Sequence, residues 1–265
     1  MTADPLLAVR GLTKTYYGLT AVDDLTFAVA AGTIVGLIGP NGSGKSTTID
    51  CISGFQRPDV GRWFLRGTEL TGRPAHAHAR AGVARTFQTV RAYETLTLLD
   101  NLRLAVQEHD GVTWWQSLAR SVSWRDAEAE ATARAHELLG VVGLTNYAGA
   151  PAEILSYGQR KLLTIAASMM ARPALVVLDE PVAGVNPTMI RRVEEVIRRV
   201  NAEGVTLLIV EHNVDFIMRL CGHVIVLDAG KKLAEGEPAE VRGDPRVLAA
   251  YLGRGRASRE AARRD

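Results

Sequence analysis

Short apolar runs and longer amphipathic stretches follow one another along most of the chain. TIVGLIG (33–39), TLLIV (206–210) and HVIVLD (223–228) are short, β-branched and bounded by glycine or polar residues, which is typical of buried parallel strands. After Pro187, TMIRRVEEVIRRVNAEG places apolar residues on one helical face and Arg and Glu on the other. This pattern predicts a helix that ends near Gly204, and hence a strand–helix–strand unit.

Two other regions have a different pattern. The early segment LLAVRGLTKTYYGLTAVDDLTFAVAAG indicates antiparallel strands with no helix between them. Residues from about 90 to 170 are mostly helical in pattern, and DAEAEATARAHELLGVVGL is the clearest helix. No repeat recurs at a fixed period, so a solenoid is excluded. The sequence therefore predicts an α/β core interrupted by a helical subdomain.

Composition narrows the class of protein. The chain has 265 residues, of which 47% are hydrophobic and 23% charged, and we expect it to be soluble and globular. Its apolar runs are far shorter than the roughly 20 residues of a membrane helix, and the N-terminus lacks the pattern of a secretory signal. The two cysteines favour a reducing compartment over a disulfide framework. A net charge of +2 does not imply a nucleic-acid partner.

The loop GPNGSGKS lies between an apolar strand and a predicted helix, and it matches the phosphate-binding pattern G-x-x-x-x-G-K-S. Its glycines let backbone N–H groups turn inward around phosphate oxygens, and the next helix directs its positive end to the same place. The lysine adds a positive charge and the serine a hydroxyl for Mg²⁺. An ordinary glycine-rich turn would not need this strand and helix context. The candidate nucleotide-binding residues are Gly39, Pro40, Asn41, Gly42, Ser43, Gly44, Lys45, Ser46 and Thr47.

A second buried strand ends in two carboxylates, in the segment ALVVLDEP. Asp179 stands where the strand emerges and is a candidate Mg²⁺ ligand, a role that P-loop proteins give to such an aspartate. Glu180 is expected to point elsewhere because side chains alternate along a strand. It is the candidate general base for an attacking water. Without the phosphate loop, this pair would be read as a simple strand end.

The motifs GPNGSGKS, RTFQ, LSYGQ, VVLDEP and VEHN, in this order and spacing, resemble those of the nucleotide-binding subunits of ABC transporters. The resemblance covers residues 6 to 252. It implies a P-loop NTPase core with an antiparallel β subdomain and a helical signature subdomain. It also implies that LSYGQ opens a helix whose N-terminus faces the ATP held by another subunit, so that two chains arranged head to tail enclose two ATP molecules. The residues of this motif implied to bind nucleotide are Ser156, Tyr157, Gly158 and Gln159.

The same resemblance implies three further roles. Tyr16 would stack on adenine, although the adjacent Tyr17 stands where the family has a small residue. Gln88 would reach Mg²⁺ or the attacking water, and would couple the core to the helical subdomain. His212 would contact the γ-phosphate and position Glu180. The implied cofactors are ATP and Mg²⁺. The implied catalytic residues are Glu180, His212 and Gln88, and the implied metal ligands are Ser46, Gln88 and Asp179.

Longer stretches, including LSYGQRKLLTIA and DEPVAGVNP, resemble ATP-binding subunits of importers for branched-chain amino acids, urea or short amides. This implies integral-membrane permease partners, a second ABC ATPase chain of the same or another kind, and indirectly an extracytoplasmic solute-binding protein, with no nucleic acid. The chain would then lie at the cytoplasmic face of the cell membrane. An ABC ATPase of a ribosomal, DNA-repair or export complex is the alternative, and a P-loop kinase or GTPase has no reason to carry LSYGQ.

The resemblance also predicts the domain organisation. Residues 1–253 would form one nucleotide-binding domain, with the core at about 1–90 and 172–235, the helical subdomain at about 91–171 and C-terminal helices at about 236–253. Residues 254–265 would be a disordered basic tail. Trp114, Trp115 and Trp124 would either form a rim near the membrane or permease, or pack inside the helical subdomain.

Overall fold

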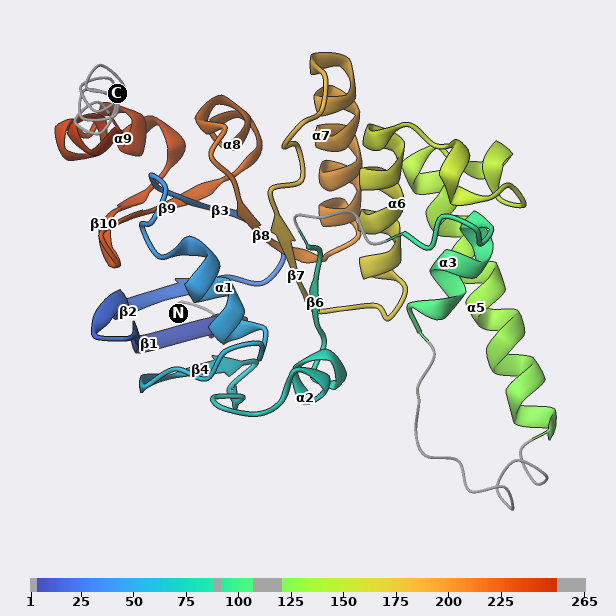
Figure 1. Cartoon of the computed structure of the whole chain (residues 1–265), viewed down its shortest axis with the longest axis horizontal. Coiled ribbons are helices and arrows are strands. Elements are labelled where there is room, and N and C mark those ends of the chain that lie inside the picture. The colour runs from blue at the N-terminus through green and yellow to red at the C-terminus, as the bar shows by residue number, and fades with distance from the viewer. Residues whose placement is uncertain (1–3, 88–91, 107–120, 252–265) are drawn as a thin grey trace. The chain divides into compact units, whose positions relative to one another are not determined.

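Two compact units make up the fold. A computed structural model describes residues 4–87, 92–106 and 121–251 (Figure 1). We call the described parts of residues 1–85, 174–181 and 201–265 the first unit, and those of residues 86–173 and 182–200 the second unit.

The first unit contains a six-stranded sheet in the order β10-β9-β3-β8-β7-β6. The five strands from β9 to β6 are parallel, and β10 is antiparallel to β9. The apolar runs predicted as parallel strands form β3, β8 and β9, so that prediction is confirmed. The strands are β3 (Ile34–Ile38), β6 (Val83–Arg85), β7 (Leu175–Asp179), β8 (Thr206–Val210), β9 (His223–Asp228) and β10 (Lys231–Gly236).

An antiparallel sheet completes the strands of the first unit, in the order β2-β1-β4-β5. It confirms the antiparallel arrangement predicted for the early segment. Along β2, Leu25, Phe27 and Val29 are buried while Thr26 and Ala28 are exposed, as expected for a sheet with one face in the core. The strands are β1 (Leu7–Tyr16), β2 (Leu19–Val29), β4 (Val60–Leu65) and β5 (Thr68–Glu69).

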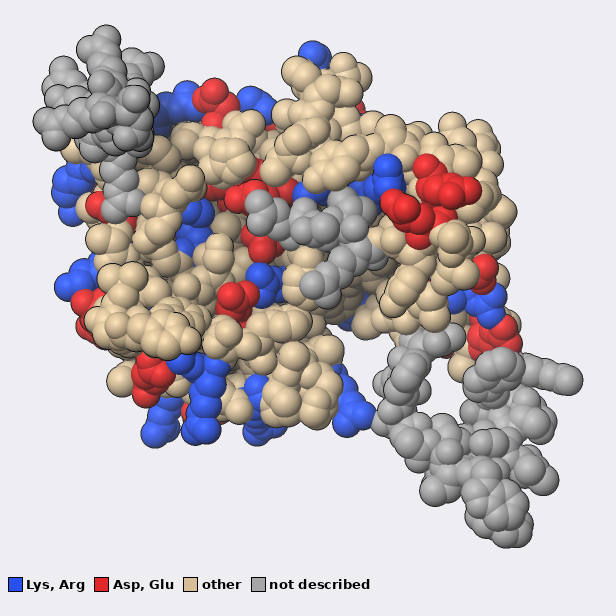
Figure 2. Space-filling view, viewed as in Figure 1, with Lys and Arg blue, Asp and Glu red and all other residues tan. Residues whose placement is uncertain are grey.

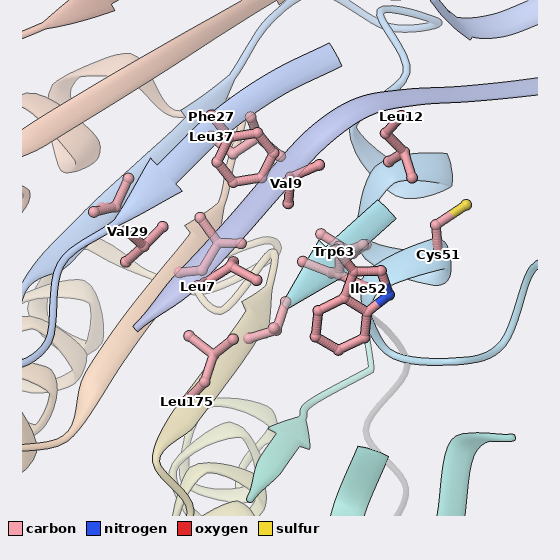
Figure 3. Close-up of a cluster of buried hydrophobic side chains, with 14 of the residues drawn as sticks. Leu7, Val9, Leu12, Phe27, Val29, Leu37, Cys51, Ile52, Trp63 and Leu175 are labelled. Atoms are coloured by element: carbon pink, nitrogen blue, oxygen red, sulfur yellow. The ribbon is translucent and has the colours of Figure 1, made fainter. Parts of the chain in front are cut away.

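One hydrophobic core joins the two sheets of the first unit through α1 (Lys45–Ile52) (Figure 3). Helix α1 contributes Ile49, Cys51 and Ile52, and β4 contributes the fully buried Trp63. Burying each large apolar side chain stabilises the fold by roughly 1.5–3 kcal/mol. The helix that follows the GPNGSGKS loop is therefore fixed by packing on both sheets, and it holds the loop in place.

Helix α8 (Val214–Leu220) packs on the other face of the six-stranded sheet. Val35 and Leu37 of β3 belong to the core beneath the antiparallel sheet, whereas Gly36 lies against α8. A Cβ atom at Gly36 would lie 2.6 Å from Cγ2 of Ile217. The remaining helices of the first unit are α2 (Ala75–Arg80), α9 (Pro238–Gly243) and a helical segment at 245–251.

Replacing Gly36 by Ala is expected to destabilise the protein by about 1–3 kcal/mol, because the added methyl group overpacks the contact with α8. Denaturant unfolding would measure the change. Gly222→Ala is the matched control, since a Cβ at Gly222 meets no atom within 4 Å. Equal stability of the two variants would show that α8 adjusts to the methyl group without cost.

The second unit is helical, as the sequence predicts, and α3, α5 and α6 pack against one another in it. The helix predicted from DAEAEATARAHELLGVVGL (126–144) begins five residues earlier than this segment and ends two residues before its last residue. It begins at Ser121 and ends at Val142, where Gly143 adopts φ +73°, a conformation that commonly ends helices. The helical elements are α3 (Leu98–Leu104), α5 (Ser121–Val142), η1 (Thr145–Tyr147), η2 (Ala152–Ile154), α6 (Tyr157–Met169) and α7 (Pro187–Ala202), whose last two residues belong to the first unit.

Charged side chains of both signs are mixed over most of the face in Figure 2, and basic ones gather along its lower edge. The exposed arginines of β4, α2 and the turns beside them are Arg57, Arg62, Arg66, Arg73 and Arg80. Among the described helices, none is long and apolar enough to cross a membrane. Gln88, Trp114, Trp115 and the tail from Arg254 lie outside the described residues, as does the side chain of Trp124.

Candidate functional site

The loop between β3 and α1 packs tightly against neighbouring backbone of the first unit. Gly39 has φ +152°, and a Cβ there would lie 2.2 Å from the carbonyl oxygen of Leu227. Gly44 has φ +100°, and a Cβ there would lie 2.5 Å from the carbonyl oxygen of Ala21. No side chain fits at either position without moving the backbone. Glycine is therefore required for the loop to curl between β2 and the end of β9.

Lys45 folds back across this loop. Its side chain is buried, and Nζ donates hydrogen bonds to the carbonyl oxygens of Gly39 at 2.7 Å and Pro40 at 3.0 Å. The ammonium group thus lies inside the curve of the loop, at the N-terminal end of α1. Helix α1 begins without a side-chain cap, so its first N–H groups add to the positive potential there. The arrangement suits an anion such as a chain of phosphates.

The strand ends of the first unit bring acidic side chains together near α1. Asp179, the last residue of β7, accepts a hydrogen bond on Oδ2 from Nη2 of Arg85 at 3.0 Å. Arg85 also donates from Nη1 to Oδ1 of Asp50, in α1, at 2.6 Å. Burial raises the pKa of the Asp179 carboxyl, although the hydrogen bond and charge of Arg85 act in the opposite direction. An arginine therefore joins the candidate metal ligand to the helix that follows the phosphate loop.

Glu180 does not continue the alternation of side chains along β7. The sequence-based explanation that strand alternation sets the direction of Glu180 is therefore wrong. The strand ends at Asp179, and Glu180 adopts φ +48°, a left-handed conformation uncommon for a residue with a side chain. Its N–H donates to the carbonyl oxygen of Val210 at 2.9 Å. Such strained residues cluster at functional sites, where the surrounding structure must hold them. A turn tied to β8 sets the direction of this carboxylate.

His212 lies between two carboxylates. Its Nδ1 atom is 3.7 Å from Oε1 of Glu180 and 3.7 Å from Oε2 of Glu211, too long for a direct hydrogen bond. Glu211 is fully buried, and its Oε2 accepts from the backbone N–H groups of His212 and Asn213. Glu211 therefore fixes the backbone that carries the histidine, while the imidazole itself is more than half exposed. The structure brings His212 and Glu180 together, as their proposed roles require.

The two tyrosines at the tip of the β1–β2 hairpin have different surroundings. Burial raises the pKa of Tyr16, and the nearby side chain of Thr47 in α1 acts in the opposite direction. Nζ of Lys14 lies 5.3 Å from the centre of the Tyr16 ring. Tyr17 is fully exposed and has φ +48°. Tyr16 is thus the tyrosine that the fold places against the helix carrying the phosphate loop.

The LSYGQ segment belongs to the second unit and begins α6. Ser156 is the N-cap, and its Oγ accepts from the N–H of Gln159 at 3.3 Å, while Gln159 Oε1 accepts from the N–H of Ser156 at 2.9 Å. This capping box uses both side chains to stabilise the first turn of the helix. A Cβ at Gly158 would lie 2.5 Å from Cγ of Met189 in α7, so glycine allows α7 to approach. Tyr157 is half-exposed beside Gly184.

The residues of the first unit that could hold Mg²⁺ are oxygen donors. Ser46, in the first turn of α1, offers a hydroxyl, and Asp179 offers a carboxylate. Hard oxygen ligands are those that Mg²⁺ prefers, and it usually takes few of them from the protein because phosphates and waters supply the rest. Within the described parts of the chain no cluster of three or more acidic, His or Cys side chains forms a metal cage. The donor set therefore fits a metal held together with phosphate oxygens.

Sequence reasoning missed Arg85, Asp50 and Glu211. The available signals were a single arginine after an apolar run in VARTF and a carboxylate between an apolar strand and a histidine in VEHN. Asn186 acts in a similar way, because its side chain caps α7 by accepting from the N–H of Met189 at 2.9 Å. These residues share one property, which is that their polar groups support the backbone or a neighbouring carboxylate.

Comparison with known proteins shows the family of this chain. Residues 22–183 match the model of the family described as "ABC transporter". The chain belongs to this family. Residues 231–257 match a second family model, described as "Branched-chain amino acid ATP-binding cassette transporter". As an ABC protein, the chain is an ATP-binding subunit.

Curated relatives of this ABC protein align over nearly their whole length. The high-affinity branched-chain amino acid transport ATP-binding protein BraF of Pseudomonas aeruginosa is 40% identical over 250 residues, which cover 94% of this chain and 98% of BraF. LivG of Escherichia coli, with the same description, is 38% identical over 252 residues, which cover 95% of this chain and 99% of LivG.

A solved cassette confirms the ABC fold. MJ1267, described as an ATP-binding cassette of an ABC transporter in its ADP conformation, has a TM-score of 0.83 and 32% identity to this chain. The match covers 95% of this chain and 100% of MJ1267. The predicted fold class is thereby confirmed, including the α/β core and the antiparallel sheet.

Proposed function

We propose that this chain is the ATP-hydrolysing subunit of an importer for branched-chain amino acids. The observation that carries the proposal is the loop from Gly39 to Lys45, with its buried ammonium group and the uncapped start of α1 behind it. The solute is inferred from the descriptions of BraF and LivG and from the second family model. The sequence left urea or short amides open as alternatives, and these relatives favour amino acids.

The first unit offers proposed partners for the phosphates, the adenine and the metal ion of the nucleotide complex. The loop residues 39–47 would bind the phosphates through backbone N–H groups and Lys45, and Tyr16 would stack on adenine. Ser46 and Asp179 would hold Mg²⁺, with Gln88, outside the described residues, as a further ligand. When bound, Mg²⁺ neutralises charge on the β- and γ-phosphates. The other contributions belong to the side chains of the chain itself.

Glu180 and His212 would carry the hydrolysis. In the reaction, water attacks the γ-phosphorus, the bond to the β-phosphate oxygen breaks, and ADP leaves. The Glu180 carboxylate would accept the proton of the attacking water, a general-base role. His212, with Nδ1 at 3.7 Å from Oε1 of Glu180, would keep that carboxylate in place and contact the γ-phosphate. Glu211 supports the histidine from the buried side.

Two chains would complete each ATP site. The start of α6 offers Ser156 and the N–H groups of the first helical turn, which suit an anion. The Ser156 oxygen accepts a hydrogen bond within the capping box, and its O–H proton is able to donate to a phosphate oxygen at the same time. We infer that this phosphate is held by a second ABC ATPase chain, of the same or another kind. Isolated chains would then hydrolyse ATP slowly.

The proposed partners follow from this role. They are integral-membrane permeases, contacted from the cytoplasmic face of the cell membrane, and indirectly an extracytoplasmic solute-binding protein. No nucleic acid is involved. The first and second units would be the core and helical parts of one nucleotide-binding domain of residues 1–253, with residues 254–265 as a basic tail.

Purification of the tagged chain from its native membranes in mild detergent, followed by mass spectrometry, tests this function. The expected partners are two polytopic permeases and a second P-loop subunit. A co-purified binding protein would then be screened for leucine, isoleucine, valine, urea and acetamide. Recovery with ribosomal or DNA-repair proteins and without a permease would contradict the transport role. Preference of the binding protein for urea or acetamide would contradict the proposed solute.

A further inference from the structure

Arg85 links two acidic side chains that come from separate parts of the first unit. It is the last residue of β6, and its side chain is only 9% exposed. Nη1 binds Asp50 of α1 at 2.6 Å and Nη2 binds Asp179 of β7 at 3.0 Å. Oγ of Ser53, directly after α1, accepts a further hydrogen bond from Nη1 at 3.0 Å. One guanidinium group therefore connects the end of β7 to the helix that follows the phosphate loop.

The arrangement depends on the shape of arginine. The planar fork presents its two terminal nitrogens in fixed directions, so it can bind two carboxylates at once. The ring of Phe55 lies against the guanidinium, with its centre 5.5 Å from Cζ, and limits its movement on that side. A lysine in this place would have one point charge on a flexible stem, and it could not hold both carboxylates in the same geometry.

We propose that Arg85 is a positioning residue, which fixes the carboxylate of Asp179 relative to α1 and thereby sets the metal affinity of the nucleotide complex. Ser46, the other candidate ligand among the described residues, stands on α1 itself. Since Arg85 ties Asp179 to Asp50 on the same helix, it fixes the position of Asp179 relative to Ser46. Groups that orient metal ligands typically change metal affinity 10–100-fold when they are removed. The inference rests on the proposed ATP and Mg²⁺ site.

Three variants of the full-length chain test the role of Arg85. Arg85→Met removes the charge and the fork, Arg85→Lys keeps the charge alone, and Asp50→Asn weakens the tether to α1 while leaving Asp179 with its partner. Arg134→Met is the matched control. Its side chain is 10% exposed and pairs with Glu137 at 2.8 Å, but it belongs to α5 in the second unit.

The first measurement is ADP affinity in EDTA, which does not involve the metal. The second is Mn²⁺ binding to the ADP complex, followed by the EPR signal of the metal. We expect all variants to bind ADP in EDTA as the unmodified protein does. We expect Mn²⁺ binding to weaken about 10–100-fold in Arg85→Met and less in Arg85→Lys and Asp50→Asn. Arg134→Met should not change it.

Other outcomes overturn the inference. If the Arg85 variants lose metal-free ADP binding to the same extent as Mn²⁺ binding, Arg85 supports the fold of the whole site and not the metal. Unchanged Mn²⁺ affinity also refutes it. Should Arg85→Met fail to fold, Arg85→Lys and Asp50→Asn decide by the same criterion. If the unmodified protein itself shows no metal-linked ADP binding, the proposed nucleotide site fails, which is a result distinct from failure of the role of Arg85.

Discussion

Replacing Glu180 by Gln is expected to slow ATP hydrolysis at least about 100-fold while ATP binding is retained, a barrier increase of roughly 2.7 kcal/mol. The amide keeps the size of the side chain and its place near His212, but it cannot accept the proton of the attacking water. Backbone strain is unchanged, because the substituted residue keeps a Cβ at φ +48°. Hydrolysis would be measured in the assembled complex, and ATP affinity by equilibrium binding.

Glu195→Gln is the control for Glu180→Gln. Glu195 is a surface carboxylate of α7, paired with Arg192 at 2.9 Å, so its replacement should leave hydrolysis unchanged. Near-normal turnover of Glu180→Gln would remove Glu180 from the role of general base. A loss of ATP affinity that matches the loss of hydrolysis would instead assign Glu180 to binding.

The fold was predictable from sequence where a segment is a continuous apolar run or a long amphipathic helix. Strands β3, β8 and β9 are continuous apolar runs, and α7 has an apolar face with charged residues opposite. Strand β6 was not predicted, because three residues are too few for a period of two to be visible. It pairs with β7 from Val83 to Arg85, and this pairing is what carries Arg85 to Asp179.

The site residues that form a local sequence motif were predictable, whereas those brought together by long-range contacts were not. The loop from Gly39 to Lys45 is a local motif, so its residues were identified directly. Arg85 was missed because its partners stand 35 and 94 residues away in the chain, and only the tertiary fold brings them together. Glu180 was identified from its place after Asp179, yet its direction was wrongly explained, since a left-handed turn is not encoded by strand alternation.

The second large effect is expected for Lys45→Ala, which should weaken ATP binding about 10–100-fold. A hydrogen bond to a charged group contributes about 1.5–3 kcal/mol, and Lys45 is the buried cation of the loop. Because the lysine of this motif reaches the β- and γ-phosphates, AMP affinity should change much less than ATP affinity. Titration calorimetry with ATP and AMP would measure both. Lys232→Ala, at a surface lysine paired with Glu235, is the control.

The melting temperature of Lys45→Ala distinguishes the loss of a phosphate contact from a loss of loop structure. Lys45 also donates to the carbonyl oxygens of Gly39 and Pro40, so its removal takes away two contacts that hold the loop without nucleotide. A lower melting temperature with equal losses for ATP and AMP would mean that Lys45 acts by shaping the loop. Selective loss of ATP affinity at nearly unchanged melting temperature would mean that its charge acts on the phosphates. Unchanged ATP affinity would contradict the assignment of this loop as the phosphate-binding site, because the methyl group of alanine cannot supply the positive charge that Lys45 places inside the loop.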